Sequence, residues 1–455
     1  MQLSTMKTKP SVVKPVVLHV VNRLPRGGFV CSVPSCRAWF HLGESALTGL
    51  HARFGSALRV VWEEHVESSE ALLWDGSECK SSEVADVSAY FKSSSLGLRA
   101  LNDESIFENP VVSVSSRCNL RCPYCYMSMP SLDKHQRKDV GVLKIKQFIS
   151  NVIELGANTT RTIQFFGGEP LLHKNLPELI AFALDRGLYV RISTNGTASR
   201  LRAESFRPYA SDKRVEWRVS LDSHIREKHE LYRGRGTFKA TQRNLEYLAS
   251  MNANVSIKTV LSRENIEDFP GYLQFAYERG FRVAYGVLGT VGDAKRHGLY
   301  SGISKLEVVK RILGLFRQEP GLVGLLRPSP FGRMIRALYV KNTSALPPFF
   351  FYMHHNETVY PMDELVHGQF QVGSWDKLDV DQMRLMHKKY CLENSACTNC
   401  AIEPFCYRGS YADTFEAGKS LDQEFTTCNE RRNIYGLLMS LGFEGASIAR
   451  AMFGN

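Results

Sequence analysis

Three closely spaced cysteines are the residues of this sequence with the clearest chemistry. Cys118, Cys122 and Cys125 have the spacing C-x3-C-x2-C and come directly after the apolar run Val111–Ser115. Cysteine sulfur holds iron–sulfur clusters, so three thiolates on one short loop can bind three corners of a four-iron cube. The fourth iron would then stay open to a substrate or cofactor. A zinc knuckle is the alternative, although zinc prefers four protein ligands arranged in C-x2–4-C pairs.

A second group of cysteines lies near the end of the chain, and no cysteine stands between the two groups. Its members are Cys391, Cys397, Cys400, Cys406 and Cys428, out of eleven cysteines in all. In a chain without a secretory segment, such clusters indicate metal binding or redox chemistry rather than disulfides. We therefore expect two metal sites. Cys391 fits no ligand position and is interpreted as an ordinary thiol. The same interpretation applies to the remaining cysteines, Cys31, Cys36 and Cys79.

A glycine-rich turn follows the next apolar run. Gly167, Gly168 and Glu169 come directly after Thr162–Phe166. Glycines at the end of a strand let the backbone approach a ligand closely, and a carboxylate beside them can receive an ammonium group. Alone, this pattern is more often a structural turn. Together with the cysteine loop it indicates a binding site.

These residues need a scaffold, and a regular alternation of strands and helices provides one. The β-rich runs are Val111–Ser115, Thr162–Phe166, Tyr189–Ser193, Glu216–Ser220, Asn254–Val260 and Arg282–Leu288; the helical segments are Val142–Leu155, Leu176–Arg186, Thr237–Ser250, Glu267–Gly280 and Lys305–Phe316. Six such units predict an α/β fold with a parallel sheet, and crossovers of one hand roll it toward a barrel. Because a complete TIM barrel needs eight units, we predict a partial (β/α)6 TIM-like barrel.

Two further regions flank this barrel. Residues 1–105 hold short strands and a helical stretch, and they are predicted to form a small N-terminal α+β domain. Residues 106–325 are the predicted core. Residues 326–455 hold loops, the second group of cysteines and a final helical stretch, Arg431–Met452. This last region is predicted to be a cysteine-rich iron–sulfur domain.

The composition excludes several classes of protein. Of the 455 residues, 44% are hydrophobic and 23% charged, as in globular proteins. No run approaches the roughly 18–20 apolar residues of a membrane span, and Met1–Pro15 lacks the apolar centre of a signal peptide, so we expect a cytoplasmic protein with no membrane partner. The net charge of +11 is spread along the chain, which argues against a nucleic-acid arm. It suits solubility or an acidic partner.

The motifs, taken in order, resemble the radical S-adenosylmethionine (radical SAM) enzymes over about Val111–Leu288. The cysteine loop and the glycine turn are followed by Ser193-Thr194-Asn195-Gly196, by Ser220-Leu221-Asp222-Ser223 and by His229-x3-Arg233. The resemblance implies a 4Fe–4S cluster on the three cysteines, with S-adenosylmethionine on its fourth iron. One electron, from a flavodoxin- or ferredoxin-type donor, would cleave this cofactor to a 5′-deoxyadenosyl radical that abstracts a substrate hydrogen.

The resemblance also implies contacts to the cofactor, all at or just beyond the carboxyl ends of predicted strands, where barrel active sites assemble. They are Gly167, Gly168 and Glu169 for the amino group, Ser193 and Asn195 for the ribose, Ser220 and Arg233 for the carboxylate, and Tyr124 near the adenine.

The C-terminal cysteines resemble the SPASM extension of enzymes that modify peptides and proteins, whose pattern is C-x2-C-x5-C-x3-C-x17-C. Four cysteines match, and Ser410 stands where the fourth of the five is expected; the matches are Cys397, Cys400, Cys406 and Cys428. The resemblance implies one auxiliary 4Fe–4S cluster on these four residues. A structural four-cysteine zinc site is the alternative.

A segment upstream resembles the Y-P-C-D sequence of the same family. Here it reads Tyr360-Pro361-Met362-Asp363, with methionine in place of the cysteine. In the family this cysteine and the one replaced by Ser410 belong to the first auxiliary cluster, so their joint loss is coherent. In sulfatase-maturing relatives the aspartate is a base, which makes Asp363 the candidate catalytic residue for taking up a proton. His354 and His355 are interpreted as ordinary, because neighbours on a strand point to opposite faces.

Three functions remain open. The first is a maturase that installs a crosslink, a thioether or another modification in a ribosomally synthesised peptide; the N-terminal region loosely resembles leader-recognition domains of such enzymes, and a strand edge could capture an extended leader. The second is a sulfatase-type protein maturase that forms formylglycine, which the long N-terminal region and the lost cluster disfavour. The third is a non-catalytic electron-transfer protein, which the ordered cofactor motifs disfavour.

The ligand positions predict the iron content. Anaerobically reconstituted protein should contain about eight irons per chain, because seven cysteines and S-adenosylmethionine complete two four-iron clusters. Iron and protein assays on the same sample measure this ratio, and about twelve irons would show that the first auxiliary cluster is present. Ser410→Cys is the companion variant: it should gain no iron, because Met362 still leaves that site short of a ligand.

Overall fold

The computed structural model describes most of the chain from residue 109 onward and shorter stretches before it. The described residues are 16–23, 29–33, 38–42, 50, 53–54, 58–62, 97–100, 107, 109–156, 160–340, 343–344, 349–392, 394–398, 400–402, 406, 411–421, 424–441 and 443–454. The predictions for Cys36, Cys79 and Ser410 lie outside these residues, as does the prediction for the side chain of Cys391. Cys31 is a buried free thiol, as predicted.

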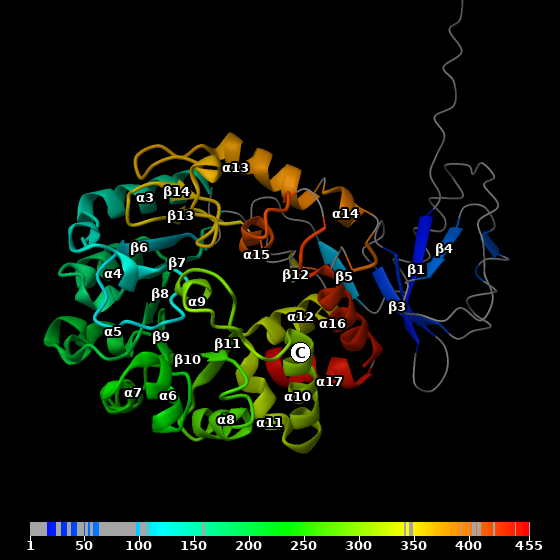
Figure 1. The fold of residues 1–455 in the computed structure, drawn as a ribbon, viewed down its shortest axis with the longest axis horizontal. Helices are drawn as coiled ribbons and strands as arrows, with labels where there is room; N and C mark the ends of the chain where they lie inside the picture. Colours follow the sequence, from blue (N-terminus) through cyan, green and yellow to red (C-terminus); the bar gives the residue numbers. More distant parts are fainter. Residues whose placement is uncertain are drawn as a thin grey trace, which may run out of the picture.

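A curved parallel sheet forms the centre of the molecule (Figure 1). Its six consecutive strands lie side by side in chain order, and each pairs in parallel with the next. They are β6 (Val111–Ser115), β7 (Thr162–Gly167), β8 (Tyr189–Thr194), β9 (Val215–Ser220), β10 (Asn254–Leu261) and β11 (Arg282–Val287). The predicted partial (β/α)6 barrel is confirmed.

Two short strands from the C-terminal region extend this sheet at its β6 edge. β13 (Tyr352–Met353) pairs in parallel with β6, and β14 (Val359–Tyr360) pairs antiparallel with β13. The sequence did not reveal these strands, because two residues are too few for a recognisable alternation of polar and apolar positions. They carry the segment that follows β14 to the same edge of the sheet.

Helices line the outer side of the curved sheet in Figure 1. In α3, the apolar residues Ile145, Phe148, Ile149 and Val152 recur at helical spacing and form one buried stripe. The helices of the barrel are α3 (Val142–Leu155), α4 (Leu176–Asp185), α5 (Arg207–Ser211), α6 (Arg226–Arg233), α7 (Thr237–Ser250), α8 (Phe269–Tyr277), α9 (Asp293–Arg296), α10 (Lys305–Gln318) and α11 (Pro320–Val323). The expected long helices are confirmed, whereas α6, which carries the His229-x3-Arg233 motif, was not expected.

The pleat of the strands divides their side chains between the two faces of the sheet. On β8, Val190 and Ile192 are buried in the hydrophobic core, while Arg191 and Ser193 face the opposite, concave side. The same alternation on the neighbouring strands collects polar and charged residues inside the barrel. The sequence pattern of each strand therefore determines which side chains can reach the interior.

A second sheet of six strands is built mainly from the N-terminal region. Its strands are, in spatial order, β12 (Thr343–Ser344), β5 (Gly97–Ala100), β3 (Ala38–Leu42), β2 (Phe29–Val33), β1 (Val16–Arg23) and β4 (Leu58–Trp62). β1, β2 and β3 form an antiparallel meander, and β4 lies parallel to β1. Because β12 comes from beyond residue 340, this sheet joins the predicted N-terminal and C-terminal regions.

Side-chain contacts hold this sheet to the rest of the protein. The fully buried Trp39 donates a hydrogen bond from Nε1 to the carbonyl oxygen of Leu338 at 3.1 Å. Its ring meets the edge of Tyr339 with centroids 5.3 Å apart. The Ser32 hydroxyl donates to the carbonyl oxygen of Ala401. The N-terminal sheet thus shares a hydrophobic core with the C-terminal region.

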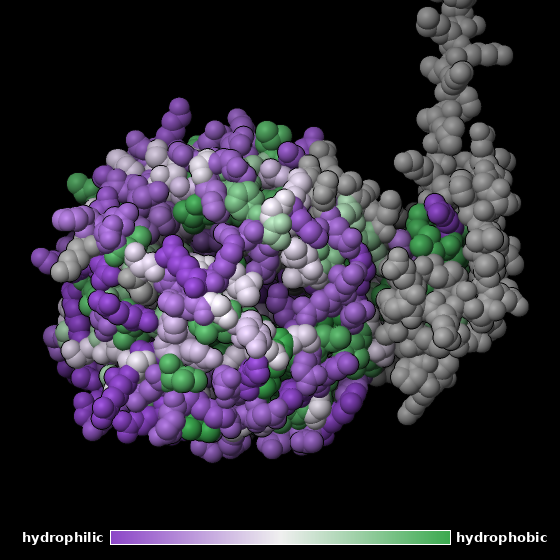
Figure 2. Space-filling view, viewed as in Figure 1, coloured by the Kyte–Doolittle hydropathy of each residue, from purple (hydrophilic) through white to green (hydrophobic). Residues whose placement is uncertain are grey.

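The C-terminal region is a set of short helices and loops. They are α12 (Pro330–Tyr339), α13 (Val380–His387), a π-helix (Lys388–Leu392), α14 (Ser395–Thr398), α15 (Tyr411–Glu416), α16 (Cys428–Ser440) and α17 (Phe443–Phe453). The predicted final helix is therefore two helices. No helix within the described ranges combines the length and hydropathy required to span a membrane. On the face seen in Figure 2, the surface over the described elements is mainly hydrophilic, with hydrophobic residues scattered between.

Candidate cofactor and substrate site

The cysteine loop is seated on the end of β7 by backbone contacts. The amides of Gly168 and Glu169 donate to the carbonyl oxygens of Ser115 and Arg117, both at 2.7 Å. A Cβ atom added to Gly168 would lie 2.1 Å from the Arg117 oxygen, and Gly167 has a φ of 133°. Only glycine allows this approach. Both glycines thus have a structural role beside the cofactor role that the sequence implied.

The three thiols of the loop lie close enough to influence one another. Burial, together with smaller effects of the Glu169 carboxylate and the other two thiols, raises the pKa of Cys118 to about 12. The amide of Leu120 donates to the Cys118 sulfur at 3.4 Å, and the amide of Cys125 donates to the carbonyl oxygen of Cys122 at 3.1 Å. Three thiolates on one loop would repel one another. A bound cationic cluster would offset this repulsion, and its coordination would keep the thiols deprotonated.

The donor set fits an iron–sulfur cube. All three thiols are half-buried on one loop at the carboxyl end of β6. In the part of the chain that the structure describes, no three His, Cys, Asp or Glu side chains converge on one ion position. The cysteines of a cube bind different iron atoms, so they do not have to converge.

Glu169 joins the ends of two strands. This fully buried carboxylate accepts hydrogen bonds from the Thr194 hydroxyl at 2.6 Å, the Asn195 amide at 2.7 Å and the Leu171 amide at 3.1 Å. Burial raises the pKa of Glu169, and these three bonds act in the opposite direction. An ionised carboxylate has about four acceptor positions. One position is therefore left for the ammonium group that the sequence assigned to this residue.

Asn195 lies directly over the cysteine loop. Its amide donates to the side chain of Asn119 at 2.9 Å and lies 3.9 Å from the sulfur of Cys118. Ser193 and Ser220, the other residues expected near the cofactor, are half-buried on the concave face of β8 and β9. The structure therefore brings the ends of β6, β7, β8 and β9 together, as the sequence predicted.

A buried ion pair organises the other side of the loop. Arg233 Nε donates to Asp222 at 2.8 Å, and only 9% and 2% of the two side chains are exposed. The Tyr124 hydroxyl donates to the same carboxylate, and the Arg233 guanidinium lies 5.7 Å from the Tyr124 ring centroid. Arg233 also lowers the pKa of Cys122, against a larger upward effect of burial. Arg233 thus lies beside Tyr124 of the cysteine loop, but Asp222 already compensates the charge of the arginine.

Asp222 is a site residue that the sequence reasoning missed. Its backbone is held as firmly as its side chain: Thr259 and Asn265 donate to its carbonyl oxygen, both at 2.9 Å. The signal was present, since Asp222 stands two residues beyond a predicted strand and eleven before an arginine. The motif that contains Asp222 does not reveal its ion pair with Arg233, because sequence spacing alone does not show that α6 folds back over the strand end.

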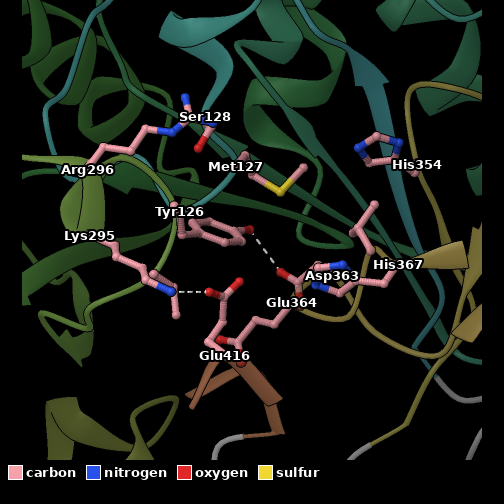
Figure 3. Close-up of a pocket in the computed structure, with 13 residues that line it drawn as sticks. Tyr126, Met127, Ser128, Lys295, Arg296, His354, Asp363, Glu364, His367 and Glu416 are labelled. Carbon is pink, nitrogen blue, oxygen red and sulfur yellow. Dashed lines mark hydrogen bonds and ion pairs between the residues drawn. The ribbon is translucent and has the colours of Figure 1, made fainter. Parts of the chain in front are cut away.

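Asp363 reaches the cysteine loop from the far end of the chain. Tyr126, the residue after Cys125, donates its hydroxyl hydrogen to Asp363 at 2.8 Å (Figure 3). Both residues line a pocket of about 480 Å³, together with Glu364 and the ion pair of Lys295 and Glu416. Burial raises the pKa of Asp363, and burial with Asp363 beside it raises the pKa of Glu364 to about 7. This pocket holds carboxylates beside the cluster loop.

The histidine pair next to this pocket corrects one prediction. His354 and His355 do not lie on a strand, because β13 ends at Met353. Their rings are 3.8 Å apart rather than on opposite faces. Burial lowers the pKa of His354, and burial with His354 beside it lowers the pKa of His355 to about 3. They pack together as neutral rings.

The four C-terminal cysteines come together at the start of α16. Burial raises the pKa of Cys428, and Cys406 and Cys397 raise it further, so these sulfurs are neighbours. The amide of Cys400 donates to the carbonyl oxygen of Cys397 at 3.0 Å. All four are half-buried against the hydrophobic core. Cys397 and Cys406 thus lie near Cys428, and the assignment of all four cysteines as cluster ligands stays a prediction.

Residues 112–276 match the Radical SAM superfamily. The chain contains a radical SAM domain. Such a domain uses a 4Fe–4S cluster and S-adenosylmethionine, and the chemistry of the three thiols on the cysteine loop fits that cluster. The matched residues run from β6 to α8 and include the cysteine loop, Glu169 and Arg233.

The radical SAM domain is similar to parts of curated enzymes. It is 30% identical over 209 residues to the Fe-coproporphyrin III synthase of Methanosarcina barkeri, covering 44% of this chain and 49% of that one. It is 29% identical over 164 residues to the mycofactocin maturase MftC of Mycobacterium tuberculosis, covering 36% and 40%. The chain thus spans about half, or less, of the length of these relatives.

Two solved structures share the fold over longer stretches. Native anSMEcpe with bound AdoMet is 18% identical, with a TM-score of 0.59 over 75% of this chain and 99% of that chain. Streptococcus suis SuiB bound to the precursor peptide SuiA is 15% identical, with a TM-score of 0.52 over 91% and 99%. The fold of the radical SAM domain and its C-terminal region is therefore shared with these proteins.

His229, next to the Asp222–Arg233 pair, makes the stability of the radical SAM domain depend on pH. Burial lowers the pKa of this imidazole from 6.5 to about 4, and its Nδ1 accepts a hydrogen bond from the Asp222 amide at 3.2 Å. The folded chain takes up this proton less readily than the unfolded chain. The contribution is complete above pH 6.5 and declines as the pH falls toward 4, by about 1 kcal/mol at pH 5.5.

Denaturant unfolding at pH 7.5 and pH 5.5 measures this loss. In His229→Gln, which keeps an acceptor for the Asp222 amide but does not titrate, the free energy of unfolding should fall less between the two pH values. His135→Gln, at an exposed position, is the matched control and should behave like the unchanged protein. Equal pH dependence in His229→Gln and the control would contradict the assignment.

Proposed function

We propose that this chain is a radical SAM maturase that modifies a residue of a ribosomally synthesised peptide, forming a crosslink, a thioether or another modification. The observation that carries the proposal is the contact between Tyr126 and Asp363. This contact brings the Asp363 carboxylate to the loop that would hold the cluster. Asp363 lies in the C-terminal segment whose sequence resembles that of the peptide maturases. The pocket beside this contact has the volume for one or two side chains of a peptide.

The roles of the chain's own residues follow from their positions. Cys118, Cys122 and Cys125 would hold the cluster, and the free acceptor position of Glu169 would receive the amino group of S-adenosylmethionine. When bound, the two cofactors supply the radical that removes a hydrogen from the substrate. The substrate would lie in the pocket of Asp363. This carboxylate would then take up a proton from the substrate, since burial raises its pKa and so makes it a better proton acceptor.

The C-terminal cysteines would hold one auxiliary 4Fe–4S cluster. These cysteines are Cys397, Cys400, Cys406 and Cys428; all four are half-buried, and Cys397 and Cys406 lie near Cys428. A buried cluster at this position suits electron transfer to or from the substrate. A reducing protein of flavodoxin or ferredoxin type would supply electrons to the first cluster.

The N-terminal sheet would bind the part of the peptide that is not modified. At one end of its described strands lies β4, which pairs with β1. An extended peptide could add to the other side of β4 through main-chain hydrogen bonds. The similarity to SuiB bound to its precursor peptide, which extends over 91% of this chain, supports a role of this kind. We propose residues 1–105 as the recognition domain, 106–325 as the radical SAM core and 326–455 as the auxiliary-cluster domain.

A short peptide encoded beside the gene tests the function. Incubated anaerobically with reconstituted protein, S-adenosylmethionine and dithionite, the peptide should change mass while 5′-deoxyadenosine accumulates, as chromatography with mass spectrometry measures. Replacement of Cys118, Cys122 and Cys125 by Ala should abolish both products. Formation of 5′-deoxyadenosine by that variant would contradict the radical reaction, and a product only with a sulfatase peptide would favour the sulfatase-type alternative.

Asp363 is tested by separating cofactor cleavage from product formation. Asp363→Asn keeps the hydrogen bond from Tyr126 but loses the basic oxygen. Product formation should fall about 100-fold or more, as for other general bases, while cleavage of S-adenosylmethionine continues. Asp381→Asn, an exposed position on α13, is the matched control and should leave both rates unchanged. Equal loss of both products in Asp363→Asn would assign this residue to cofactor binding instead.

A further inference from the structure

Three arginines meet at one glutamate inside the barrel, and we call Arg191, Arg218 and Arg282 the arginine cluster. Glu216 on β9 accepts hydrogen bonds from Arg191 Nε at 2.7 Å and from Arg218 Nη2 at 3.2 Å. The Ser256 hydroxyl donates to the same carboxylate at 2.7 Å. Arg282 Nη2 lies 3.7 Å from this carboxylate, which is within ion-pair distance but too far for a hydrogen bond. One carboxylate thus stands among three guanidinium groups.

The arginine cluster lies toward the amino-terminal ends of the strands, on the concave side of the sheet. Glu216 stands four residues before Ser220 on β9 and therefore roughly 13 Å from it along the strand. Arg191 is directly opposite Glu216 on β8, and Arg218 stands two residues before Ser220. Ser220 is one of the residues that the sequence assigned to the cofactor. The arginine cluster is therefore on the amino-terminal side of the expected cofactor position.

The arginine cluster carries more positive charge than Glu216 can balance. Burial would raise the pKa of Glu216, but the three guanidinium groups lower it to about 2, so the carboxylate is ionised at neutral pH. Burial and then Arg191 lower the pKa of Arg218 to about 10, although Glu216 raises it, and Arg333 on α12 lowers it as well. All three arginines thus stay charged. One ionised carboxylate among them leaves two positive charges.

Donor nitrogens of the arginine cluster remain available to a ligand. Among the described residues, no hydrogen bond is formed by Nη1 and Nη2 of Arg191 or by Nη1 of Arg218 and Arg282. Arg282 donates from Nη2 to the side-chain oxygen of Asn254, which carries no charge. The side chains of Arg191 and Arg282 are 27% and 38% exposed. An anion could therefore reach these nitrogens from solvent.

We propose that the arginine cluster is a binding site for a small oxyanion with two negative charges, either a phosphate group or a pair of carboxylates. Guanidinium groups bind such oxyanions through parallel N–H donors, and the charge of the anion equals the two positive charges that Glu216 leaves. None of the three arginines lines the pocket of Asp363. This second site goes beyond the proposed function and does not depend on it. A purely structural ion-pair network is the alternative, and it predicts no anion binding.

Anion binding by the full-length, reconstituted protein tests this proposal. Isothermal titration calorimetry measures the dissociation constants of inorganic phosphate and of succinate at constant ionic strength, with chloride as the background anion. The unchanged protein should bind at least one of them at one site per chain. Arg282→Met should bind it about tenfold more weakly, as expected for the loss of one charged hydrogen bond, and Arg282→Lys should lose less. Arg243→Met removes an exposed arginine of α7 and should behave like the unchanged protein.

Glu216→Gln is the variant with the opposite effect. It keeps an acceptor for Arg191 but removes the negative charge that competes with the ligand, so the anion should bind more tightly by a similar factor. Binding of phosphate alone assigns the site to a phosphate group, and binding of succinate alone assigns it to paired carboxylates; binding of both shows recognition by charge. The proposal is wrong if the unchanged protein binds neither anion, or if Arg282→Met and Arg243→Met have equal dissociation constants.

Discussion

The close backbone contact between the cysteine loop and the end of β7 is the constraint on which the site depends. The amides of Gly168 and Glu169 continue the hydrogen bonding of the sheet onto the loop that carries the cysteines. No side chain fits between the two backbones at Gly168. A substituent there would push the loop away from β7. The three thiols would then lose their position relative to Glu169 and Asn195, whose own strands are tied to the same edge.

Around this contact, the barrel holds charged groups inside the protein by compensating them in pairs and networks. Asp222 compensates Arg233, and its carboxylate also accepts hydrogen bonds from the Tyr124 hydroxyl and the Val260 amide. Such a buried pair is costly to break, because the remaining charge would have no partner in a medium of low polarity. Glu364, beyond β14, lines the pocket beside the cysteine loop, where burial and Asp363 raise its pKa and Lys258 lowers it.

The pocket beside the cysteine loop is built from several segments that lie far apart in the chain. Tyr126 comes from the cysteine loop, Lys295 from α9, Asp363 from the segment after β14, and Glu416 from α15. β13 and β14 extend the central sheet and so carry Asp363 to the cluster loop. At the same time, β12 and the contacts of Trp39 join the N-terminal sheet to the C-terminal region. A substrate held by the N-terminal sheet would thus be bound to a part of the protein that contacts the C-terminal region, which contributes Asp363 and Glu416 to the pocket.

The sequence by itself determined the class of fold and the position of most site residues along the chain. Alternating strands and helices have periods of two and 3.6 residues that can be read locally, and the spacing of Cys118, Cys122 and Cys125 is itself the ligand pattern. Residues at strand ends were placed correctly because parallel strands bring these ends to one edge. The local pattern was less informative for β13 and β14, which have two residues each, and for α6, whose one buried residue is the polar His229.

Only the tertiary structure decided which charged groups lie close together. Arg233 and Lys258 are both cations near the ends of strands in the sequence, but α6 folds back so that Arg233 meets Asp222, while the pleat of β10 turns Lys258 into the barrel. Likewise, nothing local shows that Asp363 meets Tyr126, a residue 237 positions away. Pairing of this kind depends on distances between elements that are far apart in the chain, and local sequence patterns carry no information about those distances.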